Sequence, residues 1–302
     1  MEYKDWKKWM INHPWSLKCG KGWLSKRYKV PESYITKARQ EIKGTNTNKC
    51  KILVLDIETS PLKAYVWKRW KENVSLDQTI SEWFMICWSA KWLDDDTVFG
   101  ECLTPEEIKN EDDSRITEIL WSLLDECDIV IAHNGQRFDI PKINSRFILN
   151  GLPPTSPYKI IDTLEIAKKQ FGFSSNKLDA LATYFGIENK NKTDFNLWKR
   201  CLDGEQEALD YMLEYNKKDV AILDKVYLKL RPWDKKHPNL ATILDSSNPV
   251  CPICGSTHIK LIKGDKYYHT QLSKYHSYRC DSCGAVLRDR SKVNGKTILT
   301  TT

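Results

Sequence analysis

The middle of the chain alternates short apolar runs with segments of helical periodicity. KILVLDI at 51–57 is short, apolar and rich in β-branched residues, as expected of a central strand buried on both faces. Residues 83–101 predict two further strands around an Asp-rich turn, and DIVIAH at 128–133 predicts another buried strand. Strands come first, and strands and helices then alternate. This order predicts an α/β fold with a mixed sheet covered by helices.

Helical periodicity dominates the second half of this middle segment. The pattern predicts a further strand at 158–162 and helices at 116–127, 138–150, 163–171, 176–185 and about 205–230. We therefore expect one domain over residues 49–232, bounded by the polar stretch 43–48 and by a second break that begins near Pro232.

Residues 1–48 show a different pattern, with Trp6, Trp9 and Met10 at helical spacing and a second segment at 22–28. Pro31 suits the first position of a further helix that would run from Glu32 to Ile42. Helix, short turn and helix resemble a helix-turn-helix DNA-binding unit. A helical hairpin packed on the core explains the same pattern. In the DNA-binding interpretation the candidate contact residues are Ser33, Tyr34, Thr36, Lys37 and Arg39.

Residues 233–302 comprise a linker and a pair of cysteine motifs, CPICG at 251–255 and CDSCG at 280–284. Each pair forms a knuckle whose following glycine lets the backbone turn. This spacing predicts a zinc ribbon with one structural Zn²⁺ held by Cys251, Cys254, Cys280 and Cys283. Lysines, arginines and tyrosines are mixed between the knuckles, which suits nucleic-acid binding with Lys274 and Arg279 as candidate contacts. Protein binding by the ribbon is the alternative.

Composition and charge narrow the class of protein. With 41% hydrophobic and 29% charged residues the chain can form a core, and it has neither a membrane-spanning apolar run nor a signal peptide. We therefore expect a cytoplasmic protein with no membrane partner, in which the ten cysteines are reduced. The formal net charge of +7 divides into +8 for residues 1–50, +6 for residues 251–302 and −7 between them. Basic ends would hold a polyanion, although solvated basic faces explain the same charges.

Candidate catalytic residues come from three places in the middle segment. Asp56 and Glu58 end the first strand, where a period of two puts both carboxylates on one face. Asp139 follows the strand at 128–133, at the start of a helix and at the mouth of the sheet. Tyr215 and Asp219 lie one turn apart on the long helix. Each feature is ordinary by itself, but the three in this order form a specific pattern.

The pattern resembles the DEDD exonuclease superfamily, whose ribonuclease-H-like fold includes the proofreading domains of DNA polymerases. DIETS at 56–60, HNGQRFD at 133–139 and YNKKD at 215–219 match its three motifs, and the resemblance covers roughly residues 50–230. A tyrosine four residues before the last aspartate is typical of the tyrosine subclass, which includes the exonuclease domains of family-B polymerases. The resemblance adds Asp162 in IIDTLEIAKK as a structural residue near the site.

The resemblance implies a 3′→5′ exonuclease that binds two Mg²⁺ or Mn²⁺ ions, with DNA favoured over RNA as substrate. Asp56 would bridge the ions, Glu58 and Asp219 would complete the site of the ion that activates water, and Asp139 would hold the second. Tyr215 would orient the attacking water. Because the chain lacks polymerase motifs, proofreading would need a polymerase or a replication or repair partner.

Two other functions compete with this interpretation. RNA-guided and transposon-type ribonuclease-H-like endonucleases also combine a helical N-terminal part with a zinc ribbon, but there the ribbon usually precedes the last catalytic acid. Asp219 precedes the ribbon here, although Asp289 lies within it. An inactive nucleic-acid-binding adaptor is the second alternative, and the complete set of acids argues against it.

Overall fold

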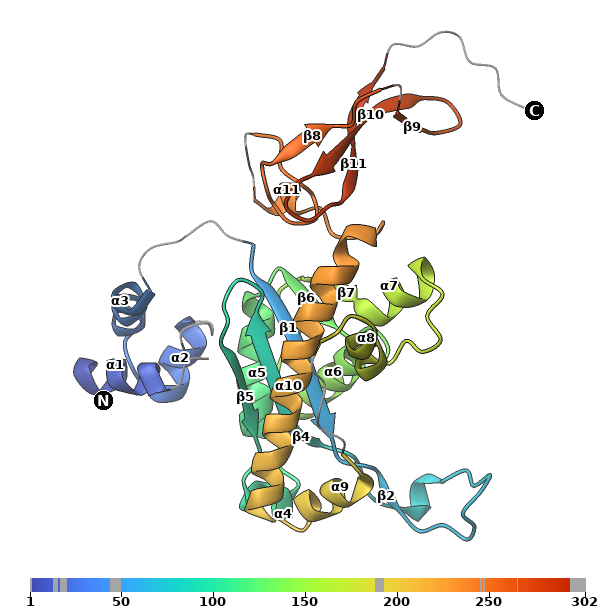
Figure 1. Cartoon of the computed structure of the whole chain (residues 1–302). Helices are drawn as coiled ribbons and strands as arrows, with labels where there is room; N and C mark the ends of the chain where they lie inside the picture. Colours follow the sequence, from blue (N-terminus) through green and yellow to red (C-terminus); the bar gives the residue numbers. More distant parts are fainter. Residues whose placement is uncertain are drawn as a thin grey trace.

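A five-stranded mixed sheet forms the centre of the molecule (Figure 1). The computed structural model describes residues 2–12, 16, 21–43, 50–187, 193–244, 246, 248–264 and 266–293. β1 pairs antiparallel with β4 and parallel with β6, which confirms the predicted mixed sheet. The strands lie in the order β5 (Val98–Cys102), β4 (Met85–Trp92), β1 (Ile52–Thr59), β6 (Ile129–Ala132) and β7 (Lys159–Asp162).

Helices cover both faces of this sheet (Figure 1). α5 (Ser114–Glu126) packs beneath β4 and beside α6 (Asp139–Leu149). The long helix α10 (Gln206–Leu230) crosses the opposite face and contacts β1, β4 and β5. The remaining helices of this domain are α4 (Pro105–Asn110), α7 (Thr163–Gln170), α8 (Leu178–Tyr184) and α9 (Phe195–Leu202), of which α7, α8 and α9 pack against α10.

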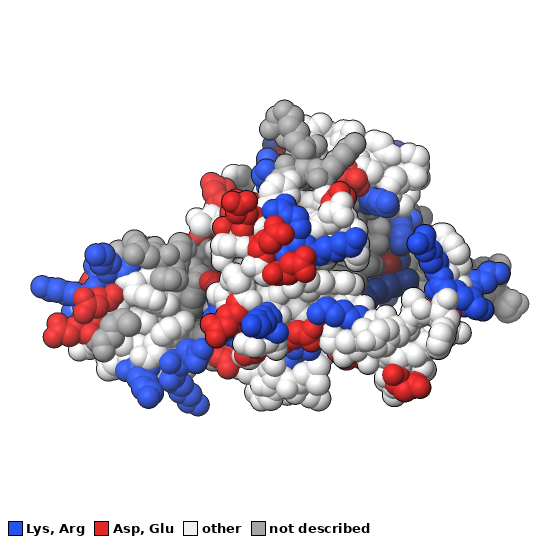
Figure 2. All heavy atoms as spheres, turned by 90° about the horizontal axis from the view of Figure 1, so that it is seen from below, with Lys and Arg blue, Asp and Glu red and all other residues white. Residues whose placement is uncertain are grey.

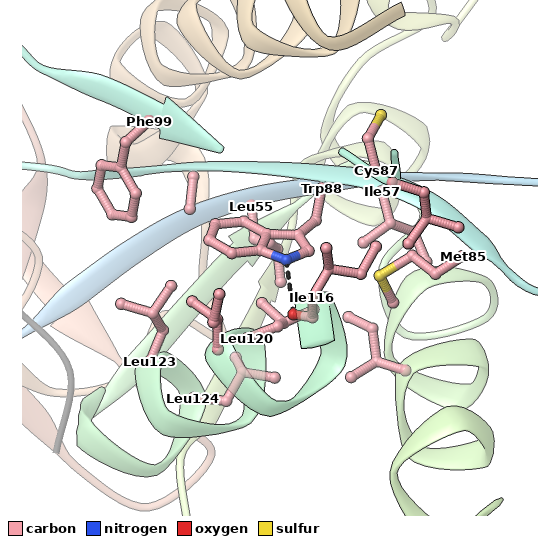
Figure 3. Packing of buried hydrophobic residues seen from close by; sticks show 14 of the residues in the cluster. Leu55, Ile57, Met85, Cys87, Trp88, Phe99, Ile116, Leu120, Leu123 and Leu124 are labelled. Atoms are coloured by element: carbon pink, nitrogen blue, oxygen red, sulfur yellow. Dashed lines mark hydrogen bonds between the residues drawn. The ribbon is translucent and has the colours of Figure 1, made fainter. Parts of the chain in front are cut away.

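The alternation of side chains along β1 divides the core into two layers. Leu55 and Ile57 face α5 and join a cluster around the buried Trp88 (Figure 3). The indole Nε1 of Trp88 donates a hydrogen bond to the carbonyl oxygen of Ile116 at 2.8 Å, so its polar atom is satisfied inside the core. Val54 faces the other way and packs with the apolar residues of α10. The even-numbered positions of β1 therefore point toward α10.

In the described part of the chain before the sheet lie the helices α1 (Tyr3–Asn12), α2 (Lys21–Tyr28) and α3 (Glu32–Lys43). The expected succession of helix, turn and helix is present at α2 and α3, and the predicted polar boundary falls largely in residues 44–49, outside the described residues. Trp6, Leu24 and Ile35 are buried in the same apolar cluster as α5. Arg27 also forms an ion pair with Glu118 of α5 at 3.5 Å. DNA binding by this segment stays a prediction.

The C-terminal part is a small sheet that begins close to the end of α10 (Figure 1). A short helix α11 (Leu240–Ile243) follows η3 (Arg231–Trp233), and the backbone N–H of Leu240 donates to the carbonyl of Pro252 at 2.9 Å. The strands are β8 (Ile259–Leu261), β9 (Tyr267–His269), β10 (Lys274–Cys280) and β11 (Val286–Lys292), and β10 pairs with each of the others.

An arm of residues 61–82 projects from the sheet between β1 and β4 (Figure 1). It contains β2 (Lys63–Ala64), η2 (Leu76–Gln78) and β3 (Thr79–Ser81). Its hydrophobic pattern matches neither a helix nor a buried strand, and the sequence did not predict it. Among the described helices, none combines the length and the apolar character that crossing a membrane requires.

A buried ion pair fixes α10 against the sheet. Lys91 of β4 and Asp224 of α10 are in contact, and their side chains are only 9% and 10% exposed. In the described part of the chain, the second carboxylate oxygen of Asp224 has no hydrogen-bond partner. Removing either partner would leave an uncompensated charge in the core.

We predict that Asp224→Ala lowers the free energy of unfolding by about 3–5 kcal/mol, because Lys91 would remain buried and unpaired. The matched control is Glu214→Ala on the same helix, which removes an exposed ion pair with Lys217 and should cost about 1 kcal/mol or less. Urea denaturation measures both values. Equal losses in the two variants would contradict a special role for the buried pair.

Candidate active site

The first two candidate acids lie on the face of β1 that α10 covers. Asp56 and Glu58 follow Val54 at a period of two, so their side chains continue its row toward α10. They stand opposite Ser89 and Cys87 of β4 in the antiparallel register. The strand that supplies core residues on one face thus supplies carboxylates on the other.

The helix α10 completes this group with Asp219. One carboxylate oxygen each from Asp56, Glu58 and Asp219 lies within 4.8 Å of the others. Mg²⁺ binds oxygen at about 2.1 Å in octahedral geometry, so neighbouring ligands are about 3.0 Å apart and opposite ligands about 4.2 Å apart. The three oxygens are therefore close enough together to bind one such ion.

Asn216, which sequence reasoning missed, orients the central carboxylate. Its side-chain nitrogen donates to Oδ2 of Asp56 at 2.6 Å, and the residue is fully buried. Met212 and Val220, one turn to either side, are also buried. A signal was present in the sequence, since an amide between two apolar positions of one helix face needs a buried polar partner.

Asp139 reaches the same place from the first residue of α6. Its side chain is buried, and its negative charge raises the pKa of both Asp56 and Glu58. Burial raises the pKa of Asp139 itself to about 7, although the N–H groups of Asp139 and Ile57 lower it. The structure therefore groups Asp56, Glu58 and Asp219 and places Asp139 near them, although Asp139 stands outside the group whose oxygens all lie within 4.8 Å of one another.

The acids repel one another strongly in the absence of a cation. Burial raises the pKa of Asp56 well above its usual range, and the charges of Asp139, Glu58 and Asp219 raise it further. Burial likewise raises the pKa of Glu58 to about 8 and that of Asp219 to about 6. Bound divalent cations would remove this penalty, so the electrostatics fit a metal centre.

Tyr215 stands beside this group on α10. Its hydroxyl lies close enough to the carboxylate of Asp219 to lower the pKa of that group, as expected from their spacing of one turn. Burial raises the pKa of Tyr215 above its usual value, and the charge of Asp219 raises it further. The phenol is therefore protonated at neutral pH, and it can donate or orient but cannot serve as a base.

Asp162 shapes the loop that leads to Asp139. Its carboxylate accepts hydrogen bonds from the backbone N–H groups of Asn134 at 2.9 Å and Gln136 at 3.2 Å, and it also caps the N-terminus of α7. Asn134 has a φ of 69°, a left-handed conformation that an asparagine tolerates. The interpretation of Asp162 as a structural residue is confirmed.

A cavity of about 350 Å³ opens beside the end of β1. Thr59, which follows Glu58, and Lys142, which lies one turn after Asp139, are in its wall. The ammonium group of Lys142 lies 3.6 Å from the centroid of the Trp83 ring. The other residues of the wall are Ser60, Pro61, Leu62, Phe195 and Trp198. The cavity combines flat aromatic surfaces with a positive charge, and sequence reasoning missed it.

The four predicted cysteines form a second compact group in the C-terminal sheet. All four sulfurs lie within 4.8 Å of one another, with 3.7 Å between Cys251 and Cys283 and 3.6 Å between Cys254 and Cys280. A tetrahedral zinc site with Zn–S bonds of about 2.3 Å places its sulfurs about 3.8 Å apart. The glycines after both knuckles have φ values of 72° and 81°, as the predicted turns require. The donor set fits Zn²⁺.

The candidate nucleic-acid contacts already have partners within the protein. The ammonium groups of Lys37 and Lys274 lie 4.7 Å and 4.6 Å from tyrosine ring centroids. Arg39 donates to the carbonyl of Ser16 at 3.0 Å, and Arg279 to the carbonyl of Gly284 at 3.1 Å. The role of these four side chains on nucleic acid stays a prediction.

Asp289, the acid that kept an endonuclease interpretation open, lies on β11 of the C-terminal sheet. Its carboxylate pairs with the ring of His276 at 3.1 Å. Among the described residues it does not join the group formed by Asp56, Glu58 and Asp219.

Comparison with known proteins agrees with this architecture. A family model described as the RNase_H superfamily matches residues 94–231. The matched segment includes Asp139 and Asp219, and it begins after β1, which carries Asp56 and Glu58. Residues 94–231 are therefore similar to the RNase H superfamily, and β1 adds the central strand of the sheet that this segment completes.

Two individual proteins are also similar to parts of this chain. Protein NEN2 of Arabidopsis thaliana is 33% identical over 79 residues, which are 23% of this chain and 16% of NEN2. The family B DNA polymerase of the archaeon Pyrobaculum calidifontis has 15% identity and a TM-score of 0.46, over 63% of this chain and 26% of the polymerase chain. The chain thus spans only a minor part of the length of either protein.

The raised pKa values predict how stability depends on pH in protein freed of Mg²⁺ and Mn²⁺. The acids titrate near pH 4 when unfolded and at about 6–8 when folded, so the folded state binds more protons between these limits. Their stabilising contribution is complete below pH 4 and is lost as the pH rises through 6–8. We expect the melting temperature to be lower at pH 8 than at pH 6, and added Mg²⁺ to restore it.

Asp56→Asn removes one of the repelling charges and should reduce this pH dependence, whereas Asp210→Asn on the exposed face of α10 should not change it. Scanning calorimetry of zinc-replete protein measures the effect. The same pH dependence in Asp56→Asn and in the unmutated protein would contradict the assignment.

Proposed function

We propose that the chain is a metal-dependent 3′→5′ exonuclease that hydrolyses phosphodiester bonds, with DNA favoured over RNA. The observation that carries this proposal is the half-buried group of Asp56, Glu58 and Asp219, whose oxygens lie within 4.8 Å of one another, with the buried Asp139 close enough to raise the pKa of Asp56. Buried carboxylates that repel one another are costly for stability alone. Binding of two Mg²⁺ or Mn²⁺ ions accounts for the cost.

Each residue has a distinct role in this proposal. Asp56, held in place by the amide of Asn216, would be a ligand shared by the two metals. Glu58 and Asp219 would hold one of them, and Asp139 would hold the other. The metals would activate a water molecule and neutralise the charge that develops on the leaving oxygen. Tyr215, which is protonated and lies beside Asp219, would orient the attacking water.

The cavity beside the end of β1 favours attack at the end of a nucleic-acid strand. Its volume of about 350 Å³ is suited to one nucleotide, and Trp83, Phe195 and Trp198 offer ring faces for a terminal base. Lys142 is placed to face a phosphate. A site that accepts one terminal unit releases nucleotides stepwise, and this is the ground for preferring an exonuclease to an endonuclease.

In this proposal the two ends of the chain bind nucleic acid. The C-terminal cysteines hold one structural Zn²⁺, and the basic segments 1–50 and 251–302 attract the phosphate backbone toward an acidic centre that binds through its metals. Because proofreading requires a polymerase, a polymerase or a repair complex is the partner that fits this activity.

We predict stepwise release of nucleotides from the 3′ end of a labelled linear strand in Mg²⁺ or Mn²⁺. A strand labelled at its 5′ end should shorten progressively, and a covalently closed circle should resist digestion. Gel analysis of a panel of single- and double-stranded DNA and RNA measures polarity and preference. Cleavage of the circle at the rate of the linear strand would overturn the exonuclease assignment.

Two variants serve as controls in that assay. Asp56→Asn should reduce the rate by more than about 10³-fold, because both metals lose a ligand. Tyr215→Phe removes a hydroxyl beside the proposed metal ligand Asp219 and should cost only about 10–100-fold. Equal losses in both would mean that the phenol does more than orient water.

A further inference from the structure

The arm of residues 61–82 is attached rigidly at its base. The backbone N–H of Ser60 donates to the carbonyl of Phe84 at 2.9 Å, and the N–H of Phe84 donates to the hydroxyl of Ser60 at 2.8 Å. Glu111 of the neighbouring loop binds Lys63 at 2.7 Å and the hydroxyl of Ser81 at 3.1 Å. The arm is therefore held from both of its sides beside the end of β1.

The outer part of the arm exposes aromatic side chains to water. Trp67 is 91% exposed, Trp70 is 83% exposed and Tyr65 is 74% exposed. Within the described residues, no ring stacks on either indole. Large apolar side chains gathered at one exposed place mark a surface that binds something. Nothing in the packing of the arm itself explains two tryptophans there.

The charges around these rings identify the kind of ligand. Residues 65–71, YVWKRWK, contain Lys68, Arg69 and Lys71 and no acidic residue. Basic side chains also gather on the right of Figure 2, the side toward which the arm extends in Figure 1. Lysine is depleted from protein–protein interfaces, whereas aromatic rings interleaved with lysine and arginine are typical of surfaces for single-stranded nucleic acid.

The position of the arm fits a strand that ends in the acidic site. Trp67 lies nine positions after Glu58, so the Cα atoms of the two residues are at most about 30 Å apart. At about 3.4 Å per stacked nucleotide, this distance corresponds to fewer than about ten nucleotides. A strand whose 3′ end occupies the cavity beside Thr59 and Leu62 can therefore reach the arm with its preceding nucleotides.

We propose that this arm is a binding platform for single-stranded nucleic acid. Trp67 and Trp70 stack on unpaired bases, and Lys68, Arg69 and Lys71 contact the phosphates between them. A duplex cannot offer its base faces to the indoles, so the arm selects single strands or single-stranded 3′ tails. The inference rests on the proposed nuclease function for the direction of the strand, but the binding itself does not require cleavage.

The test is fluorescence anisotropy with labelled oligo(dT) and oligo(U) of about 20 nucleotides, long enough to span the arm and the site. Mg²⁺ and Mn²⁺ are omitted, so that the oligonucleotides are not cleaved during the measurement. Binding can then be measured even if the proposed nuclease function is wrong. The double variant Trp67→Ala/Trp70→Ala should weaken binding about 30-fold or more, because stacking contributes about 1–3 kcal/mol per base and tenfold corresponds to 1.4 kcal/mol. Affinity for a blunt duplex should change much less.

Two control variants separate stacking from other effects. Trp67→Phe/Trp70→Phe keeps a ring face at each position and should retain most of the affinity. Leu76→Ala removes an apolar side chain that is 89% exposed on the same arm and should leave the affinity unchanged. Unchanged oligonucleotide affinity in the double alanine variant would overturn the proposal. The proposal would also fail if Leu76→Ala weakened binding equally, or if the alanine variant abolished self-association and left oligonucleotide binding intact.

Discussion

The packing of α10 across the sheet determines the geometry of the candidate site. This helix supplies Asp219 and Tyr215 directly and holds Asp56 through the amide of Asn216. Its position on the sheet is fixed by apolar packing and by the buried ion pair between Lys91 and Asp224. A small shift of the helix along its axis would separate Asp219 from the acids of β1. The position of one helix therefore controls both the core and the chemistry.

The acidic site lowers the stability of the folded protein, and the surrounding apolar core offsets this cost. Burial and mutual repulsion raise the pKa values of its carboxylates, so the apo site opposes folding at neutral pH. The two apolar layers on either side of β1 must offset this cost. Gly100 of β5 shows how close the packing is, because a Cβ there would lie 2.4 Å from the carbonyl oxygen of Trp88 and 3.1 Å from Leu213 of α10. The geometry of the proposed metal site depends on this close packing around it.

The sequence predicted those parts of the protein that follow from local periodicity. All five strands of the sheet and its longest helix were predicted, because apolar runs and a helical period reveal buried elements directly. The four acids were found through motif order. Asn216 was missed because its partner, Asp56, lies 160 residues away, and only the tertiary fold shows that contact. The arm was missed because exposed Trp67 and Trp70 break the rule that large apolar residues are buried.

Anomalous diffraction at the manganese edge tests most directly whether the four carboxylates form a two-metal centre. The crystal would contain the full chain with Mn²⁺ and a nucleoside 5′-monophosphate. We predict two manganese peaks about 3.5–4 Å apart, with Asp56 between them, Glu58 and Asp219 at one and Asp139 at the other. Saturating Mn²⁺ that leaves no peak at these carboxylates would contradict the account.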